Sequence, residues 1–427
     1  MKDRPLQITT LFAALVSVGI SWPLPEARAE EELRSRFDLE AVQGILAVQR
    51  LDGWLLCDQQ GQNPIASELV NPAGRVTRRW FYLIPAKGQP VALVHKSEVA
   101  SFEKVLGRKQ EYSGHRDLKD GLRSMLQGVK RVSMEYAPKS SIPSLTRVDA
   151  GTASLVRSLG VEIRSSANLV QFTKSLWGPE GRIAHYVAAH HLTKLRDEAL
   201  AFVAARVRTG TSVTEYDVQQ FLLRGYKVRG IEGGPPTVAV RENTGDPNYV
   251  PAANRSAAIR EGDLLLLGLS ARLADAKRPI FADLTCVAYV GASVPERLAK
   301  MYRVVVDARD QARKLIETRL ARRRAIKGFE VDQLARRVVG EAGFADRFLH
   351  RTGHSLDTSL EGDGANLDDY ETHDTRNLVM GSGFTIEPGL YFKDDFGVRA
   401  EVNAFISTRG LEVTTPAQDE IIPILAR

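Results

Sequence analysis

Cysteine is scarce in this chain of 427 residues, which contains only Cys57 and Cys286. An oxidising compartment would permit a disulfide between two cysteines. Both residues, however, lie in strand-like apolar stretches that we assign to different domains. We therefore expect two buried, unpaired cysteines rather than a crosslink.

Long hydrophobic runs are lacking beyond the N-terminus. No later stretch approaches the roughly 20 uninterrupted apolar residues that a membrane-spanning helix needs, and the run at 6–20 is itself too short for a comfortable span. Two basic residues precede this run, and Ala27-Arg28-Ala29 supplies small residues for signal-peptidase cleavage before Glu30. We expect a cleaved signal peptide at 1–29, a periplasmic or secreted mature protein and no stable membrane insertion. The alternative is a disordered or peripheral N-terminal helix.

A strong excess of charge of one sign is also missing. The chain has 58 basic and 52 acidic residues, and the net charge of +6 is small for this length. The densest basic cluster, at 319–327, lies in a helix-like stretch rich in Ala and Leu and is explained as a solvated helix face. No aromatic-interleaved basic motif accompanies it, so we expect no nucleic-acid partner.

The composition is that of a globular protein with room for two domains. Residues 30–177 alternate between helical and strand patterns and include a hairpin with strands at 79–84 and 91–94. Gly178-Pro179 marks a break between structural elements. We therefore expect a smaller domain at 30–177 and a larger one at 178–427.

The larger domain contains a weak internal sequence repeat. A long helical pattern at 180–208 is followed by a Gly-containing turn, and Ser212 with Glu215 is predicted to form a capping box that opens the next helix. The stretch 327–344 repeats this order of turn, helix start and helix. Two such helix–turn–helix units separated by strands fit a pseudo-two-fold arrangement.

Acidic and imidazole side chains recur in short motifs of the larger domain. They are Asp283 in FADLT, His354 in HRTGHS, Glu387 in FTIEPGLY and Glu401 in GVRAEVN. Three carboxylates and an imidazole suit a divalent metal of borderline-hard character. Strand alternation also places Arg399, Glu401 and Asn403 on one polar face, which indicates a lined cavity.

Each of these residues also has an ordinary structural explanation. Asp283 could be a strand-end aspartate bonded to backbone, since a buried acid is costly unless it is paired or ligated. Glu401 could belong to a buried Arg–Glu network, and His354 could be a satisfied structural histidine. The combination of the motifs, rather than any one of them, favours a metal site.

The motifs and their order resemble the pita-bread metallopeptidase family, which includes aminopeptidase P, prolidase, methionine aminopeptidase and the metal-free creatinase. The segments MEYAP, TRVDAGT and SSANLVQF are similar to the N-terminal domain of aminopeptidase-P-type proteins. The resemblance implies an α/β fold with two parts. The C-terminal pita-bread domain has a curved antiparallel sheet, outer helices and a pseudo-two-fold, and a smaller α/β N-terminal domain precedes it.

The resemblance also assigns roles to individual residues. It implies that Asp283, His354, Glu387 and Glu401 hold one ion of Mn, Co, Zn or Fe, with Glu387 as the general base. His350 matches a position that contacts substrate near the metals.

Three positions depart from the pattern of the family. Gly268 in GDLLLLGLS stands where an aspartate ligates the second ion, so that second site should be weak or empty. Asn248 in DPNYVP and Glu361 in SLEGDGANLD stand where the family has histidines.

The resulting expectation is an exported metallopeptidase-like protein that hydrolyses short peptides of the Xaa-Pro type, or another small amide, with one metal and at a reduced rate. The first alternative is a non-catalytic peptide-binding protein that keeps the fold. The second is a metal-independent hydrolase like creatinase, against which Asn248 counts. The resemblance also allows a homo-oligomer.

Overall fold

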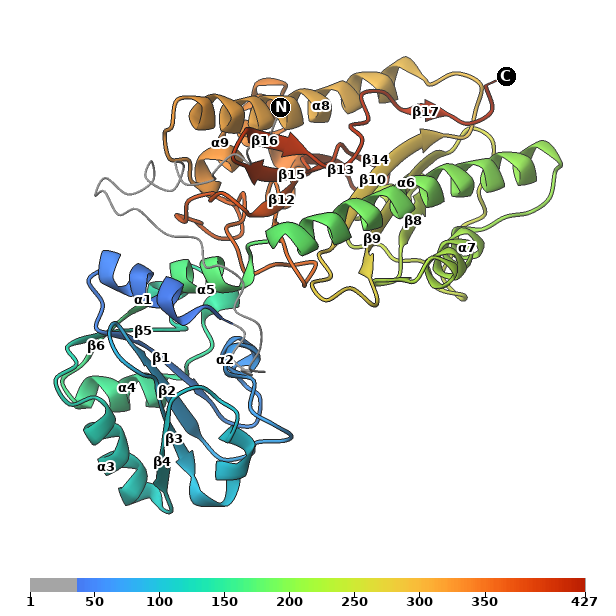
Figure 1. Cartoon of the computed structure of the whole chain (residues 1–427). Coiled ribbons are helices and arrows are strands. Elements are labelled where there is room, and N and C mark those ends of the chain that lie inside the picture. The colour runs from blue at the N-terminus through green and yellow to red at the C-terminus, as the bar shows by residue number, and fades with distance from the viewer. Residues whose placement is uncertain (1–36, 427) are drawn as a thin grey trace, which may run out of the picture. The chain divides into compact units, whose positions relative to one another are not determined.

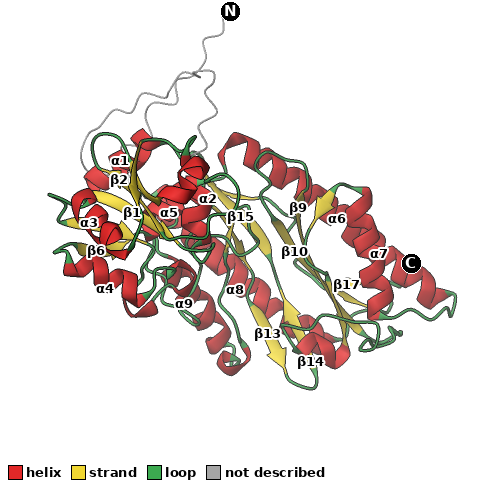
Figure 2. Cartoon of the chain, turned by 90° about the horizontal axis from the view of Figure 1, so that it is seen from below, coloured by secondary structure: helices red, strands yellow, loops and turns green. Residues whose placement is uncertain are grey.

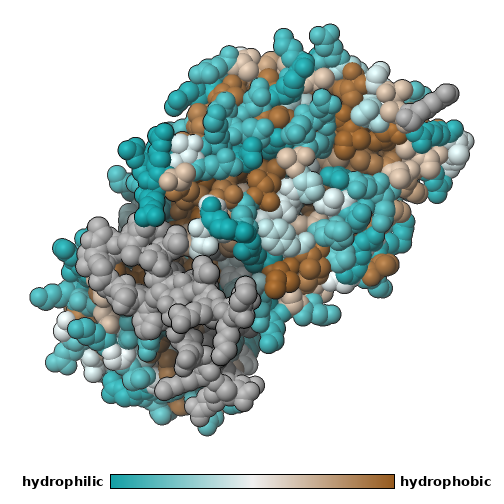
Figure 3. Space-filling view, turned by 45° about the horizontal axis from the view of Figure 1, so that its top comes forward, coloured by the Kyte–Doolittle hydropathy of each residue, from teal (hydrophilic) through white to brown (hydrophobic). Residues whose placement is uncertain are grey.

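The structure, a computed structural model, describes residues 37–426 of the chain. These residues fall into two compact units, an N-terminal unit that ends at Thr173 and a C-terminal unit that begins at Lys174 (Figure 1). The predicted signal peptide lies outside the described residues. Every helix within 37–426 is too short or too polar to cross a membrane. On the face drawn in Figure 3, hydrophilic side chains predominate and hydrophobic ones form separate patches.

The N-terminal unit is a mixed sheet with helices packed on it. Its helices are α1 (Leu39–Val48), α2 (Pro64–Val70), α3 (His115–Met125), α4 (Ala150–Ser158) and α5 (Ala167–Lys174), with 3-10 turns η2 (Lys96–Phe102), η3 (Pro138–Ser140) and η4 (Pro143–Leu145). Its strands are β1 (Gly53–Asp58), β2 (Trp80–Pro85), β3 (Val91–His95), β4 (Arg108–Tyr112), β5 (Arg131–Met134) and β6 (Glu162–Ser165).

The strand order of this sheet is β4-β3-β2-β1-β5-β6. Strands β2 and β3 pair antiparallel, which confirms the predicted hairpin. Strands β5 and β6 extend the sheet in parallel beside β1. Two apolar clusters, one on each face of the sheet, form the core of this unit.

The C-terminal unit carries the motifs of interest. Its helices are α6 (Gly178–Arg208), α7 (Glu215–Val228), α8 (Glu296–Ala321) and α9 (Gly328–Glu341), with 3-10 turns η5 (Arg241–Gly245) and η6 (Ala345–Arg347). Its strands are β7 (Ile231–Glu232), β8 (Thr237–Val240), β9 (Leu264–Leu273), β10 (Ala282–Tyr289), β11 (Ser355–Leu356), β12 (Gly383–Ile386), β13 (Gly389–Phe392), β14 (Phe396–Arg399), β15 (Val402–Ser407), β16 (Gly410–Val413) and β17 (Ile422–Pro423).

Helices α6 and α7 cover one face of the strands β8, β9 and β10 (Figures 1 and 2). The residues that pack against these helices alternate along the strands and include Leu265, Leu267 and Leu269 of β9 and Leu284 and Cys286 of β10. Because side chains alternate between the faces of a strand, the intervening residues point to the opposite face. Those residues are Gly268, Ser270, Asp283 and Thr285.

Helices α8 and α9 cover the second group of strands in the same way. Val398, Ala400, Val402 and Ala404 share an apolar core with residues of α8. Arg399, Glu401 and Asn403 alternate with them, and they are left on the uncovered face. The polar face that the sequence predicts is therefore created by packing its apolar neighbours against a helix.

The helix pairs α6–α7 and α8–α9 form the predicted internal repeat. Helix α7 begins with a capping box of Thr214 and Asp217, and at the start of α9 the Glu330 carboxylate accepts from the backbone N–H of Lys327 at 2.8 Å. The capping box predicted from Ser212 and Glu215 is wrong by two residues. Glu215 is instead buried and accepts hydrogen bonds from the backbone of Val240 and from the Tyr249 hydroxyl, at 2.7 and 2.6 Å.

Two smaller predictions have different outcomes. Cys57 and Cys286 are both buried and unpaired, as predicted. The basic cluster lies only partly on a helix, because α8 ends at Ala321 and Arg323 has a left-handed backbone with φ of 52°.

Candidate metal centre

The uncovered faces of β10 and β15 meet at the four predicted ligands. Asp283 lies on β10, and its backbone N–H donates to Asn403 Oδ1 of β15 at 2.8 Å. Glu401 lies between β14 and β15, and its Oε2 accepts from the Thr285 hydroxyl of β10 at 2.6 Å. These two cross-strand bonds align the two carboxylates in one polar layer.

His354 lies at the centre of this layer. Its Nε2 is 3.3 Å from Glu387 Oε1 and 3.6 Å from Asp283 Oδ2. His354 and Glu387 are both buried, at 5% and 7% exposure. The structure therefore brings three of the four predicted ligands into direct contact, with Glu401 held beside them through Thr285.

Hydrogen bonds orient each donor group. The His354 Nδ1 lies 3.2 Å from the carbonyl oxygen of Ser355, which can only accept, so Nδ1 carries a proton and Nε2 faces the carboxylates. The Thr385 hydroxyl donates to Glu387 Oε1 at 2.9 Å and accepts from the His354 backbone N–H at 2.9 Å. Asn403 Nδ2 donates to Glu401 Oε1 at 3.3 Å. Such partners are typical of the groups around a metal ligand.

The electrostatics of the cluster favour positive charge at its centre. Burial raises the pKa of Glu401 well above its ordinary value, and the charges of Asp283 and Glu387 raise it further. Burial opposes the charged form of Glu387 as well, but His354 and Arg399 outweigh it and hold the pKa of Glu387 below its ordinary value. Burial also opposes charge on His354, yet the bond to Asp283 and the charge of Glu387 raise the pKa of His354 to about 10.

These donors suit one divalent ion in their chemistry, and two of their separations match those between ligands of one ion. Donor atoms about 2.0–2.2 Å from a tetrahedral ion lie about 3.3–3.6 Å from one another. Both separations measured from His354 Nε2, 3.3 and 3.6 Å, fall in that range. No group of three His, Cys, Asp or Glu side chains within 37–426 is yet arranged so that it could hold an ion. Ion binding would therefore have to draw the oriented donors together.

Gly268 offers no donor at the place where the resemblance expects a ligand of the second ion. Gly268 lies in the middle of β9 rather than at a strand end, and it pairs with Thr285 of β10 and Thr237 of β8. Arg399 reaches this place from β14, with its Nη1 3.7 Å from Glu387 Oε2 and its Nε donating to Thr285 Oγ1 at 2.7 Å. The side chains of Arg272 and Arg278 point elsewhere, to the backbone oxygens of Thr358, Lys174 and Leu176.

His350 lies beside the cluster and is half-buried. Its Nδ1 is 2.7 Å from the backbone oxygen of Arg351, and its Nε2 is 2.9 Å from the Tyr391 hydroxyl. Burial lowers the pKa of His350 to about 4, so the ring is neutral near pH 7. Since the carbonyl oxygen can only accept, Nδ1 donates and Nε2 accepts from Tyr391. In this arrangement His350 orients the Tyr391 hydroxyl.

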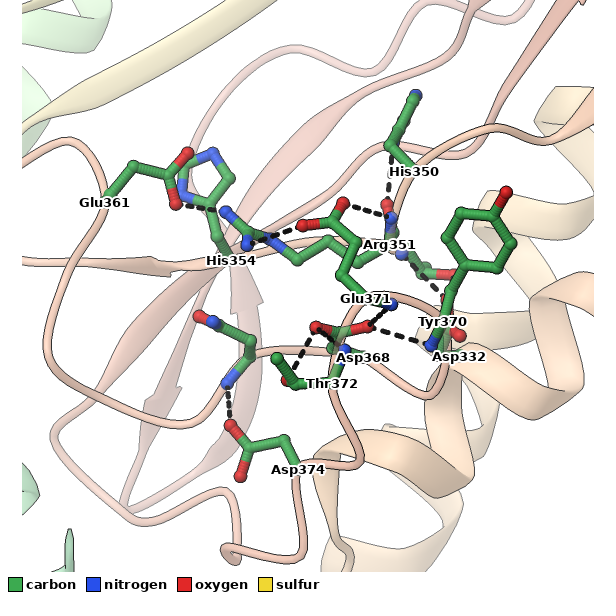
Figure 4. Close-up of polar contacts among 12 residues, drawn as sticks. Asp332, His350, Arg351, His354, Glu361, Asp368, Tyr370, Glu371, Thr372 and Asp374 are labelled. Atoms are coloured by element: carbon green, nitrogen blue, oxygen red, sulfur yellow. Dashed lines mark hydrogen bonds and ion pairs between the residues drawn. The ribbon is translucent and has the colours of Figure 1, made fainter. Parts of the chain in front are cut away.

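Glu361 belongs to a charged network at the rim of the centre. Figure 4 shows its carboxylate beside the Arg351 guanidinium and the ring of His354, with Glu371 on another side of Arg351. Arg351 Nη1 lies 3.2 Å from Glu371 Oε2. The Glu361 side chain is 65% exposed, so its charge is available to a ligand entering from solvent.

The third altered position, Asn248, lies in an exposed turn. Its backbone N–H donates to Asp246 Oδ1 at 2.9 Å. The neighbouring Asp246 and Pro247 line a small cavity together with Tyr391 and Arg399. The loop that carries Asn248 thus borders the centre through these neighbours.

Sequence reasoning did not identify two residues of the centre, Thr285 and Thr385, as functional. Thr285 joins Arg399 to Glu401, and Thr385 joins His354 to Glu387. Alternation placed Thr285 on the face of Asp283, and that was the available signal for it. Thr385 precedes Glu387 by two residues on β12, and the same period-two argument could have identified it.

The model of metallopeptidase family M24 matches residues 182–408, more than half of the chain and all four clustered side chains. The chain belongs to metallopeptidase family M24. A segment of 164 residues is 29% identical to the "Xaa-Pro dipeptidase" of Pyrococcus furiosus, and it covers 38% of this chain and 43% of that protein. A segment of 234 residues is 27% identical to the "Putative dipeptidase YkvY" of Bacillus subtilis, and it covers 54% of this chain and 58% of that one. The matches thus span about half the length of these curated relatives.

Solved structures of two dipeptidases share the fold over nearly the whole chain. Dipeptidase PepE from Mycobacterium ulcerans is similar with a TM-score of 0.67 and 19% identity, covering 90% of this chain and 96% of that one. A dipeptidase from Pyrococcus horikoshii OT3 is similar with a TM-score of 0.61 and 23% identity, covering 90% and 99%. The predicted family and the predicted two-part α/β fold are therefore confirmed.

Proposed function

We propose that this M24 protein binds short peptides, Xaa-Pro peptides among them, and cleaves them slowly with one divalent ion. The observation that carries the proposal is the contact of His354 Nε2 with Glu387 and Asp283, set beside a Gly268 that offers no ligand. The printed name of the Pyrococcus furiosus relative supports the substrate class. Mn, Co, Zn and Fe all suit this donor set.

The proposed roles follow from how the donors are held. His354, Asp283, Glu387 and Glu401 would hold the ion, which would activate a water and polarise the scissile carbonyl. Glu387 would accept the proton of the attacking water at a carboxylate oxygen, since Thr385 fixes one of its oxygens and leaves the other toward Arg399. Against the effect of burial, the charges of His354 and Arg399 and the hydrogen bond from Thr385 would keep this carboxylate ionised, as its lowered pKa indicates.

Reduced turnover follows from two altered positions. Asn248 and Glu361 replace histidines that would stabilise the tetrahedral intermediate, and losing one such donor typically costs ~100- to 1,000-fold in turnover. The Glu361 carboxylate, which cannot donate when ionised, suits the positively charged amino terminus of a peptide instead. The Arg351 guanidinium holds it at the rim.

The test is hydrolysis of Ala-Pro and of an N-acetylated counterpart by the purified mature chain. We expect slow cleavage of the free dipeptide that requires added Mn²⁺ or Zn²⁺ and stops with a chelator. Glu387→Gln should abolish cleavage, and the acetylated substrate should bind less well. Absence of cleavage by a chain that is loaded with metal would overturn the proposal.

A second function, peptide binding without cleavage, is favoured by one specific observation. Gly268 offers no donor where the resemblance expects a ligand of the second ion, although the fold is intact. Calorimetry with Ala-Pro separates the two functions, because binding without turnover supports this one. Cleavage that persists after exhaustive chelation would instead support the metal-independent hydrolase.

We also propose that the protein is exported, on the basic start, short apolar run and Ala27-Arg28-Ala29 of its sequence. N-terminal sequencing of the cellular protein should give Glu30 as the first residue. A retained Met1 on protein from the cytosol would contradict export. A homo-oligomer remains a prediction that size-exclusion chromatography with light scattering can check.

A further inference from the structure

A cavity of about 480 Å³ lies in the C-terminal unit, between the end of helix α8 and the hairpin of β15 and β16. Helix α8 and strand β16 pack against each other there (Figure 1). The residues that line this cavity are distinct from the four proposed metal ligands. Its volume falls within the range of about 300–1,000 Å³ that is typical of pockets for small ligands.

The floor of the cavity is apolar. It continues the core in which α8 packs on the second group of strands. Its members are buried or half-buried side chains, namely Leu320, Ile326, Leu378, Met380, Ile406 and Leu411. Because removing apolar surface from water is favourable, this floor suits the apolar body of a ligand.

Guanidinium groups stand at the rim of the cavity. Arg323, Arg324 and Arg409 line it and are exposed. Glu317 also lines it, but its Oε1 lies 3.5 Å from Arg313 Nη1, so it has a cationic partner of its own. Among residues 37–426, the acidic side chains near the end of α8 pair with other arginines, and neither Arg323 nor Arg324 forms an ion pair. The rim therefore offers two guanidinium groups to a negatively charged ligand.

The backbone at the end of α8 shows that the turn itself does not need an arginine. The Arg324 N–H donates to the Arg319 carbonyl oxygen at 2.9 Å, and the Arg323 N–H donates to that of Leu320 at 2.9 Å. Arg323 has φ of 52°, the left-handed conformation that glycine adopts at helix ends without strain. A guanidinium is thus held at a position where the backbone favours a residue with no side chain.

We propose that this cavity binds a small amphipathic carboxylate, a molecule with an alkyl body of medium length and one carboxylate head. The alkyl body lies on the apolar floor, and the carboxylate accepts hydrogen bonds from Arg323 and Arg324. A guanidinium presents paired N–H donors that match the two oxygens of a carboxylate. A cationic ligand would be repelled by the rim. The inference is independent of the metal centre and of the proposed function.

The experiment is calorimetric titration of the full mature chain with octanoate. Acetate has the same head without the alkyl body, and octanol has the alkyl body without the charge. We expect one equivalent of octanoate to bind. Acetate should bind at least about tenfold more weakly, because it leaves the apolar floor uncovered. Octanol should bind several-fold more weakly, because the guanidinium groups at an exposed rim lose their ionic partner.

Variants of neighbouring arginines test the rim. Arg323→Gly and Arg324→Gln each remove a guanidinium group, and Arg322→Gln is the matched control. Arg322 is exposed and directly precedes Arg323, but it lies outside the cavity lining. The Kd for octanoate should rise about tenfold in the double variant and stay unchanged in the control. Arg323→Gly should not lower the melting temperature, because glycine favours the φ of 52° at this position.

A titration of the chain saturated with Mn²⁺ separates this cavity from the metal centre. Equal octanoate affinity with and without Mn²⁺ supports the inference, whereas binding that requires Mn²⁺ would place octanoate at the metal centre and overturn it. Absence of octanoate binding, equal binding of octanol, or equal Kd values in the double variant and Arg322→Gln would also overturn it. Association with phosphatidylglycerol vesicles without binding of octanoate would assign the rim to a membrane surface instead.

Discussion

The His354 imidazole is the single residue on which ion binding depends most, because its Nε2 is the atom that contacts both Glu387 and Asp283. His354→Ala removes this donor and leaves three acidic groups beside Arg399. We expect the variant to lose measurable Zn²⁺ binding in calorimetric titration, since removing a ligand lowers the number of donors below that of a stable site.

His350→Ala is the matched control for this change. His350 lies four residues earlier, and its ring bonds Tyr391 and the Arg351 backbone. Its loss should leave ion affinity within a few-fold of the wild type, while substrate binding changes. Equal Zn²⁺ affinity in His354→Ala and the wild type would contradict the assignment of His354 as a ligand.

A second residue-scale prediction concerns Glu361. Glu361→Gln removes the rim charge that faces solvent beside Arg351. We expect KM for Ala-Pro to rise several-fold with little change in kcat, because an amino-terminal ammonium loses a partly exposed ionic partner. Steady-state kinetics check this split. An equal effect on free and N-acetylated peptides would show that Glu361 does not recognise the amino terminus.

Single residues also show the limit of what a sequence reveals. Asp283, His354, Glu387 and Glu401 could be singled out because each lies in a recognisable motif. The proximity of Arg399 to Gly268 could not be predicted, because it depends on the register of β8, β9 and β10. Alternation alone placed Arg399 on the correct face and could not tell how far its side chain reaches.

At the scale of elements, helix α6 is joined to the site strands by a buried histidine. His185 Nδ1 lies 2.7 Å from the Phe281 carbonyl oxygen, and Nε2 lies 2.7 Å from Thr414 Oγ1. Burial lowers the pKa of His185 to about 4, against about 6.5 in the unfolded chain. The unfolded state therefore binds the proton more readily between these pH values.

The resulting pH dependence can be stated with its sign. The contribution of neutral His185 to stability is fully present above pH 6.5 and is lost as the pH falls toward 4. The loss in free energy of unfolding should be on the order of 3 kcal/mol. Urea unfolding at pH 7 and pH 4.5 should show it in the wild type, and His185→Gln should show a smaller difference. The same slope in both proteins would contradict the account.

Strand β12 packs its backbone directly against an aromatic ring. A Cβ added at Gly383 would lie 1.8 Å from Trp177 Cζ2, and Trp177 donates its indole N–H to the Leu356 backbone oxygen at 2.6 Å. Gly383→Ala should lower the free energy of unfolding by about 1–3 kcal/mol or more, because the ring cannot be accommodated without backbone movement. Gly234→Ala, where nothing lies within 4 Å, is the control in the same urea experiment.

Elements were predictable wherever local signals and tertiary contacts agree. The hairpin of β2 and β3 and the long helix α6 are predicted by the periodicity of their apolar residues and by the glycine and proline residues at their ends. The predicted start of α7 was wrong because the Glu215 side chain makes tertiary hydrogen bonds and does not cap the helix. Its carboxylate accepts from Val240, Asn243, Tyr249 and Ala257, a set of contacts that no local pattern could indicate.

At the scale of the whole molecule, fold and chemistry are separable. The two largest apolar cores of the C-terminal unit involve helices and strands on the sides away from the carboxylates, so the fold does not require a complete metal centre. Family membership was therefore predictable from the sequence, although Gly268 stands where the resemblance expects a ligand. The single ion expected from Gly268 stays a prediction, because ion binding depends on how three carboxylates, His354 and Arg399 are arranged in one small space.

The count of tightly bound divalent ions per chain tests the central claim most directly. Purified mature protein should be saturated with Mn²⁺ or Zn²⁺, dialysed against buffer of low metal content and measured by elemental analysis. The account predicts one equivalent, held by His354 and its neighbouring carboxylates beside the fixed charge of Arg399. Two equivalents, or none, would contradict it.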